Sequence, residues 1–314
     1  METMEAKEKK RFVSENEAKA DFDDVYTAET PHAYIASMAE NGYEIGERAR
    51  PFCCDAIKLL QEKNGITWPT QLLDVGCSYG IGSAFVKYSC TFDELVAFFA
   101  SRAPEDYITA CEATRQWINI TAPAFDVRCV GLDTSKPAIQ FAMDAGLLDG
   151  GITCNFESNE TPSKEDLGWI RGCNMLMTTG AIGYVTEKTL DVVLSNLGKS
   201  HPSYFGPIAV MTILRMFDTN PIKQCFEKHG LTFCKVPDVR LPQRNFADEE
   251  ERLQILSVLH DRKIDTTKWE DKGKLFADLY VAAPKDEIEV LWERMIQTAK
   301  ELSTEEQPTS YIHR

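Results

Sequence analysis

The sequence predicts an α/β fold in which helices cover both faces of a mostly parallel sheet. Short apolar segments alternate with helical patterns along most of the chain, and several of these segments end in an aspartate or a glycine-rich turn. Short, continuously apolar segments are typical of strands that are buried on both faces. The length of 314 residues suits one large α/β domain with additions.

Seven apolar segments are expected to be strands. They are residues 71–76, 128–133, 151–157, 173–180, 206–216, 231–237 and 275–283. Helical patterns separate them, at residues 49–62, 81–89, 134–151, 186–198 and 221–230. The pattern at 134–151 shows the start and stop signals most clearly, because it begins with a serine and an early proline and ends in glycine.

The domain organisation follows from these patterns. Residues 49–284 are expected to form the main domain, interrupted by a helical insertion at about 91–125 and a second insertion at about 238–276. Residues 1–48 begin as a charged tail and then mix aromatic with acidic residues, so we expect a helical lid that packs on the domain. Residues 285–314 are predicted to be an amphipathic helix and a tail.

The charge balance bears on partners. Lys and Arg number 34 and Asp and Glu number 49, which gives a net charge of −15. An acidic surface repels phosphate backbones, so a nucleic-acid substrate is not expected. The alternative interpretation of the charge is solubility alone.

Cysteine usage and hydropathy bear on the compartment. The ten cysteines include no CxxC pair and no zinc-finger spacing, so no metal site is predicted. No apolar run approaches the roughly 20 residues that span a bilayer, and the charged start has no signal-peptide pattern. We therefore expect a cytoplasmic protein without a membrane segment; the sequence does not indicate its oligomeric state.

The strongest chemical signal is a turn between a strand and a helix, in the segment LLDVGCSYGIGSA at 72–84. An apolar strand leads to Asp74, and Gly76, Ser78 and Gly80 then form a tight turn. Such a turn lets backbone N–H groups approach a ligand closely. The spacing does not match the G-x-G-x-x-G fingerprint of dinucleotide-binding dehydrogenases.

A second signal is Asp133, at the end of the next expected strand, VGLD. A carboxylate at this place can accept hydrogen bonds from two ribose hydroxyls. Alternatively, it caps the following helix together with Thr134 and Ser135. Asp133 follows Gly76 by 57 residues, against about 20 in a simple β–α–β unit. The ribose role therefore requires that the insertion at about 91–125 leaves and rejoins the core.

These residues resemble class I S-adenosylmethionine-dependent methyltransferases of the small-molecule type. Leu72, Leu73, Asp74, Gly76 and Gly80 match that family's nucleotide motif, with Ser78 in place of the middle glycine. The resemblance covers about residues 49–284. It implies a seven-stranded, mostly parallel, Rossmann-like sheet whose last strand is antiparallel, with S-adenosyl-L-methionine as cofactor and S-adenosyl-L-homocysteine as product.

The resemblance also implies roles for individual residues. The loop at 76–80 would cradle the methionine part of the cofactor, and the end of the second strand would hold the ribose. Residues after the third strand would lie near the adenine, and the end of the fourth strand would lie beside the sulfonium. The implied cofactor residues are Asp74, Gly76, Cys77, Ser78, Gly80, Asp133, Thr134, Asn155, Phe156, Thr178, Thr179 and Gly180.

The expected acceptor is a small molecule, and its site is indicated less directly. His32, in the expected lid, is the best candidate for a base, and Tyr184 is the second candidate for a catalytic role. Arginine binds carboxylates and tyrosine faces hold cationic amines. On this ground the candidate substrate-binding residues are Tyr26, Tyr34, Arg215 and Arg244. For each of them, ordinary packing or an ion pair is the competing interpretation.

Methyl transfer from a sulfonium requires alignment and the exclusion of water, so no fixed catalytic residue is obligatory. Two alternatives therefore stay open. The chain could methylate a protein or peptide side chain, which predicts an open groove. It could also be a non-catalytic protein that only binds the cofactor.

Overall fold

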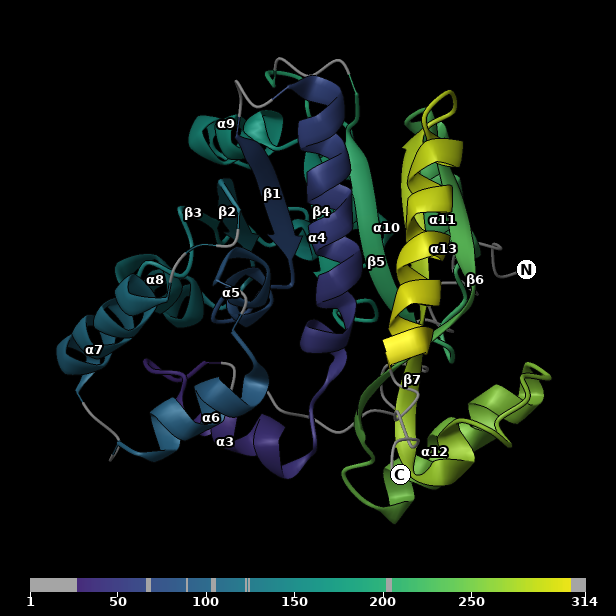
Figure 1. Ribbon diagram of the computed structural model, residues 1–314, viewed down its shortest axis with the longest axis horizontal. Coiled ribbons are helices and arrows are strands. Elements are labelled where there is room, and N and C mark those ends of the chain that lie inside the picture. Colours follow the sequence, from purple (N-terminus) through teal and green to yellow (C-terminus); the bar gives the residue numbers. More distant parts are fainter. Residues whose placement is uncertain are drawn as a thin grey trace, which may run out of the picture.

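The computed structural model describes residues 27–305, apart from 66–68, 89, 103–105, 122, 124 and 202–204. Its centre is a seven-stranded sheet with the order β3-β2-β1-β4-β5-β7-β6 (Figure 1). The strands are β1 (Thr70–Val75), β2 (Val127–Leu132), β3 (Gly150–Ile152), β4 (Met175–Thr179), β5 (Ile208–Leu214), β6 (Leu231–Asn245) and β7 (Lys274–Pro284).

The pairing of the strands confirms the predicted fold class. β1 pairs in parallel with β2 and with β4, β2 pairs in parallel with β3, and β4 with β5. β7 runs antiparallel to both of its neighbours, β5 and β6. The sheet is therefore mostly parallel with an antiparallel last strand, as the resemblance implies.

Helices cover both faces of this sheet. Because the chain crosses from β1 to β2 in one direction and from β4 to β5 in the other, right-handed crossovers place α5 and α10 on opposite faces. In Figure 1, α4 and α13 lie in front of the sheet. The described helices of the main domain are α4 (Ile45–Asn64), α5 (Ile81–Tyr88), α8 (Lys136–Asp144), α9 (Lys164–Gly172), α10 (Glu187–Leu194), α11 (Asn220–Lys228) and α13 (Ile288–Glu305).

The described part of the first insertion, at about 91–125, is mostly helical. Two helices, α6 (Phe92–Ala100) and α7 (Tyr107–Ile120), lie between α5 and β2. β2 then returns beside β1, with Leu73 paired to Val130 and Val75 to Leu132. The chain thus leaves the core after α5 and rejoins it, and the carboxyl ends of β1 and β2 meet at one edge of the sheet.

The second insertion differs in part from the sequence interpretation. β6 continues through Asn245, so residues 238–245 belong to the sheet and only α12 (Glu249–Asp261), η2 (Glu270–Lys272) and their connections form an insertion. The segment LPQRNFADEEERLQ at 241–254 resembles a loop in sequence. β6 is an edge strand, however, and an edge strand tolerates proline because one side of it needs no ladder hydrogen bonds.

The described part of the leader consists of residues 27–31 and α3 (His32–Glu40), followed by a turn into α4. Backbone hydrogen bonds connect this turn to the end of β6: Glu44 N–H donates to Gln243 O (2.7 Å), and Asn245 N–H donates to Asn41 O (2.7 Å). Among the described residues, no helix combines the length and the apolar character needed to cross a membrane.

Candidate functional site

A cavity of about 360 Å³ opens at the carboxyl ends of β1, β2 and β4. This is the edge at which open α/β sheets bind ligands. Three parts of the chain line it: the strand ends with the turns that follow them, the leader, and the end of β6. The lining residues are Thr27, Tyr34, Tyr43, Asp74, Gly76, Cys77, Ser78, Ile81, Gly82, Leu132, Asp133, Thr134, Ser135, Cys154, Asn155, Phe156, Glu157, Thr179, Gly180, Ala181, Tyr184, Val185, Thr189 and Gln243.

The turn after β1 has an unusual backbone. Gly76, Ser78 and Gly80 all have positive φ angles, of 74°, 47° and 73°. Glycine adopts this region without a steric cost, whereas serine does so at a penalty. At Gly76 a Cβ would also lie 2.2 Å from the Cβ of Ala181, so only glycine fits there. Every second residue of this turn thus has a left-handed backbone conformation, which explains why the motif has small residues at alternate positions.

Gly80 serves the turn and does not line the cavity. A Cβ at this position would lie 3.1 Å from Leu148 and 3.4 Å from Ala142, so the absence of a side chain lets the turn pack closely against the segment around α8. The prediction that Gly80 contacts a cofactor is thus not supported by its position, and its conformation explains its presence in the motif.

The backbone at Ser78 is tied to Asp133. Ser78 N–H donates to Asp133 Oδ2 at 2.8 Å, and Ser135 N–H donates to Asp133 Oδ1 at 2.9 Å. Asp133 thus joins the turn after β1 to the start of α8, where Ser135 and not Asp133 is the N-cap. It also lines the cavity. Each carboxylate oxygen has a second lone pair, so the carboxylate can still accept hydrogen bonds from a ligand.

Burial raises the pKa of Asp133, and the two backbone hydrogen bonds oppose that shift. The hydroxyl of Ser78 is buried in the same wall, where no described residue gives it a hydrogen-bond partner. A buried hydroxyl without a partner is costly unless a ligand or water satisfies it.

Asp74 is the most deeply buried carboxylate of the cavity wall. Ser83, on α5, donates its hydroxyl to Asp74 Oδ2 at 2.9 Å. Burial raises the pKa of Asp74 to about 7, and the nearby charge of Asp133 acts in the same direction. Gly82 faces this carboxylate, because a Cβ there would lie 3.2 Å from Asp74 Oδ2.

The segment after β3 supplies the next part of the wall. Asn155 and Phe156 both line the cavity, with Phe156 buried at the start of the short helix η1 (Phe156–Ser158). Asn155 Oδ1 accepts a hydrogen bond from Ser158 N–H at 3.1 Å and so caps η1. The predicted strand at 151–157 thus ends at Ile152, because a polar cap replaces the ladder.

Glu157 is a lining residue that the sequence interpretation missed. Its carboxylate accepts hydrogen bonds from the backbone and side chain of Thr186, at 2.8 and 2.6 Å, and from the hydroxyl of Thr189 at 2.6 Å. These bonds hold η1 against the start of α10. No motif marks Glu157, since its partners lie about 30 residues further along the chain.

Only some of the residues at the end of β4 line the cavity. Thr179 and Gly180 line the cavity, and Gly180 N–H donates to the hydroxyl of Thr212 at 3.2 Å. Thr178 is fully buried and does not line the cavity, because neighbouring residues of a strand point to opposite faces. The prediction of a cofactor contact is therefore not supported for the side chain of Thr178.

The leader reaches the cavity through Tyr34 and Tyr43. It is held there by Tyr79, a fully buried residue of the glycine turn, whose hydroxyl donates to Ala28 O at 2.6 Å. The ring of Tyr34 also packs on that of Tyr79, with centroids 5.4 Å apart. Tyr26, a predicted substrate-binding residue, lies outside the described residues.

His32, the predicted base, does not line the cavity. Its ring packs edge-on against Phe99 of α6, with centroids 5.1 Å apart, and its Nδ1 lies 3.2 Å from the hydroxyl oxygen of Thr30. His32 therefore joins α3 to α6. Tyr184 does line the cavity, and its side chain is 44% exposed, which places it where the cavity opens to solvent.

The two arginines that were predicted to bind the substrate form buried ion pairs within the protein. Arg215 and Glu270 form a buried ion pair at 2.6 Å, and a second nitrogen of Arg215 donates to Asp265 O. Arg244 binds Glu251 through two hydrogen bonds, at 2.8 and 2.6 Å, and both side chains are buried. Neither arginine lines the cavity. Each connects the second insertion to the sheet instead of binding a substrate carboxylate.

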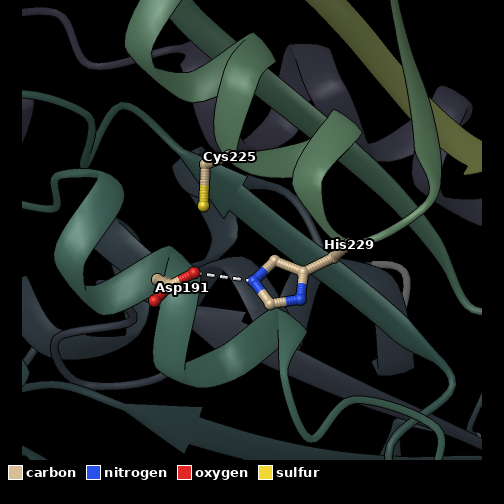
Figure 2. A group of neighbouring side chains, drawn as sticks. All are labelled: Asp191, Cys225 and His229. Carbon is tan, nitrogen blue, oxygen red and sulfur yellow. Dashed lines mark hydrogen bonds and ion pairs between the residues drawn. The ribbon is translucent and has the colours of Figure 1, made fainter.

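One further group of possible metal ligands lies between α10 and α11. Figure 2 shows Asp191, Cys225 and His229, whose ligand atoms all lie within 4.8 Å of one another. Asp191 Oδ1 is 2.7 Å from His229 Nε2 and 2.6 Å from the ammonium of Lys228. Burial raises the pKa of Cys225 to about 12, so its thiol stays protonated and donates to Glu187 O. These contacts are those of an ion-pair network that ties the two helices.

Comparisons with known proteins place the chain near several solved structures. It is similar to the plantazolicin methyltransferase BpumL in complex with SAH, at 10% identity and a TM-score of 0.41, covering 90% of this chain and 99% of that chain. It is similar to the CurJ carbon methyltransferase, at 11% identity and a TM-score of 0.43, covering 81% and 59%.

A third similar structure is the [4+2]-cyclase SpnF, at 12% identity and a TM-score of 0.35, covering 74% of this chain and 81% of that chain. No family model matches the sequence, and no curated protein matches it. With identities this low and TM-scores below 0.5, the functional assignment rests on this chain's own residues.

Proposed function

We propose that this chain is an S-adenosylmethionine-dependent methyltransferase that acts on a small molecule. The observation that carries the proposal is the hydrogen bond between Ser78 N–H and Asp133, which unites the left-handed turn after β1 and the acidic end of β2 in one cavity wall. These are the two features on which the resemblance to class I methyltransferases depends.

The residues present fit such a cofactor. The cavity volume of about 360 Å³ is in the range of small-molecule sites. Asp133 has acceptor capacity left for ribose hydroxyls, and the buried hydroxyl of Ser78 has no partner among the described residues. We propose that the cofactor is held by Asp74, Gly76, Cys77, Ser78, Asp133, Thr134, Asn155, Phe156, Thr179 and Gly180, all of which line the cavity.

The bound cofactor would supply a methyl group that its sulfonium charge has already activated. The contribution of the chain is then to align the acceptor and to exclude water. Tyr34 and Tyr43 of the leader and Gln243 of β6 supply further parts of the cavity wall. We propose that Tyr184 contacts the acceptor at the mouth. No histidine occurs among the described lining residues, and of the lining carboxylates Asp74 and Asp133 are assigned to the cofactor while Glu157 is engaged by Thr186 and Thr189. We therefore assign no general base.

The shape of the site supports a small acceptor. A protein side chain would need an open groove, whereas the leader and the end of β6 both contribute walls to this cavity and are joined to each other by backbone hydrogen bonds. The net charge of −15 argues against a nucleic-acid acceptor. We also propose a cytosolic location, which is supported by ten cysteines that form no disulfide.

Calorimetry with S-adenosylhomocysteine and, separately, with NAD tests the cofactor assignment. We expect binding of the sulfur nucleoside with micromolar-range affinity and no binding of NAD; the reverse result would refute the proposal. Incubation with S-adenosylmethionine labelled at the methyl group and a cell extract then tests the reaction. Label in small molecules supports the proposal, label in protein supports a protein methyltransferase, and no transfer supports a binding protein.

A further inference from the structure

Four of the cavity-lining residues that are not assigned to the cofactor form a group with a distinctive composition. We define the acceptor subsite as Tyr34 and Tyr43 of the leader, Tyr184 after β4, and Gln243 of β6. It combines three aromatic rings with one amide and contains no charged group. This definition rests on the function proposed above.

Gln243 is placed at the junction of the two parts of the cavity. Its backbone oxygen accepts the hydrogen bond from Glu44 N–H of the leader. On the other side it contacts the end of β4, since a Cβ on Gly180 would lie 2.9 Å from Gln243 Nε2. Gly180 precedes Ala181, which in turn packs against Gly76 of the glycine turn. Gln243 is thus connected to the turn assigned to the cofactor through Gly180 and Ala181.

The amide of Gln243 is buried without full satisfaction. The residue is 6% exposed, and its Oε1 has no hydrogen-bond partner within the described ranges. An unpaired buried carbonyl costs free energy, which a well-folded protein rarely tolerates without a reason. Rotation about the Cγ–Cδ bond exchanges the two ends of the amide, so the oxygen can turn toward a ligand that donates a hydrogen bond.

The charge of the cavity restricts the ligand further. Its only charged lining residues, among those the structure describes, are Asp74, Asp133 and Glu157, and all three are acidic. The two nearby arginines are held in buried ion pairs by Glu270 and Glu251. The lining therefore offers no cation that could pair with a carboxylate or phosphate of the acceptor, whereas the tyrosine faces favour a cation.

From these observations we propose that the acceptor subsite binds an amine, whose N–H donates to Gln243 Oε1 and whose positive charge or developing positive charge faces the tyrosine rings. The subsite excludes anionic acceptors. Gln243 is a substrate-positioning residue in this proposal, and the unsatisfied amide is a cost that the folded protein bears in the absence of the amine.

The test uses three probes with one phenylethyl body: phenethylamine, 2-phenylethanol and 3-phenylpropionate. Their binding to the full-length protein saturated with S-adenosylhomocysteine is measured by ligand-observed NMR at pH 7. We expect the amine to bind at least tenfold more tightly than the carboxylate, with the alcohol between them. Equal binding of amine and carboxylate, or no binding of the amine while S-adenosylhomocysteine binds, would overturn the proposal.

Three variants locate the effect. Gln243→Leu should weaken the binding of the amine and the alcohol by about five- to tenfold, the value of one hydrogen bond, and leave affinity for S-adenosylhomocysteine unchanged. Gln243→Lys should reverse the preference in favour of 3-phenylpropionate. Gln254→Leu, at an exposed position of α12 outside the cavity lining, should change nothing.

Stability separates a positioning role from a structural one. If Gln243 only supports the fold, Gln243→Leu lowers the urea midpoint. If it is kept for a ligand, the apolar replacement removes an unsatisfied oxygen, so the midpoint should stay or rise while amine binding falls. A fall in both overturns the proposal. Failure of all variants and the wild type to bind S-adenosylhomocysteine would instead contradict the proposed function.

Discussion

The carboxylate of Asp133 accepts one backbone N–H from each of two loops, that of Ser78 at 2.8 Å and that of Ser135 at 2.9 Å. It is therefore a structural link between β1 and β2 as well as a group of the cavity wall. The structural role depends on the two backbone donors, whereas the role in the cavity wall depends on a ligand.

Replacing Asp133 with Ala removes both roles. Charge-assisted hydrogen bonds are worth roughly 1.5–3 kcal/mol each, so affinity for S-adenosylhomocysteine should fall at least tenfold in calorimetry. Asp133→Asn keeps one acceptor oxygen and should lose less. Asp261→Ala, at an exposed position of α12, is the matched control. Unchanged affinity in a folded Asp133→Ala protein would mean that the ribose is held elsewhere.

The Tyr79 hydroxyl should hold the leader at the cavity. Tyr79→Phe removes its hydrogen bond to Ala28 O, a loss of about 1 kcal/mol, without removing the ring. Hydrogen exchange of amides in residues 32–40 should become faster by about fivefold relative to the sheet. Tyr88→Phe, which loses a comparable bond to Gly146 O, is the control and should not affect α3. Equal exchange in both variants would show that packing alone fixes the leader.

Asp74 should make stability depend on pH. Burial raises its pKa to about 7, so the folded protein binds a proton that the unfolded chain has already released above about pH 4. Stability should therefore fall as pH rises from about 4 to about 7 and then level off. Asp74→Asn should reduce this slope in urea unfolding. Glu270, whose pKa burial also raises to about 7, should supply slope that remains. An unchanged slope in Asp74→Asn would place the titration elsewhere.

Arg244 should matter for stability and not for ligand binding. Arg244→Leu leaves Glu251 buried without its partner, which typically costs 3–5 kcal/mol, roughly the range expected in urea unfolding here. The double variant Arg244→Leu with Glu251→Leu should recover most of that loss. Affinity for the amine and carboxylate probes should be the same as in the wild type wherever the variant is folded. If Arg244→Leu weakened the binding of the carboxylate probe alone, Arg244 would be a substrate-binding residue after all.

Some features of this fold and of the cavity follow from the sequence, and others do not. The alternation of apolar segments with helical patterns predicted the mostly parallel sheet, and the rule that parallel strands end at one edge explains why Ser78 meets Asp133. The order of the strands was not predicted, because it depends on tertiary pairing. Thr178 shows the limit of that rule, because one residue of register decides whether a side chain points into the cavity or away from it.

The arginines and Gln243 could not be predicted, for a different reason. Whether Arg215 binds a substrate or a protein carboxylate depends on Glu270, a partner 55 residues away that no pattern connects to it. Gln243 lies in the segment LPQRNFADEEERLQ, whose sequence suggested a loop, and the edge position of β6 is what allows a strand that contains Pro242. Tertiary pairing decided each of these cases.

The hydrogen bonds between residues 41–44 and 243–245 have a consequence for biosynthesis. The leader leaves the ribosome before the rest of the domain. The strand that it binds, β6, is made about 200 residues later and is itself paired with β7, which follows it. Contacts between segments this far apart in sequence form late in folding. A nascent chain can therefore complete most of its sheet while the ligand cavity still lacks a wall, so ligand competence should arise only once β7 has left the ribosome.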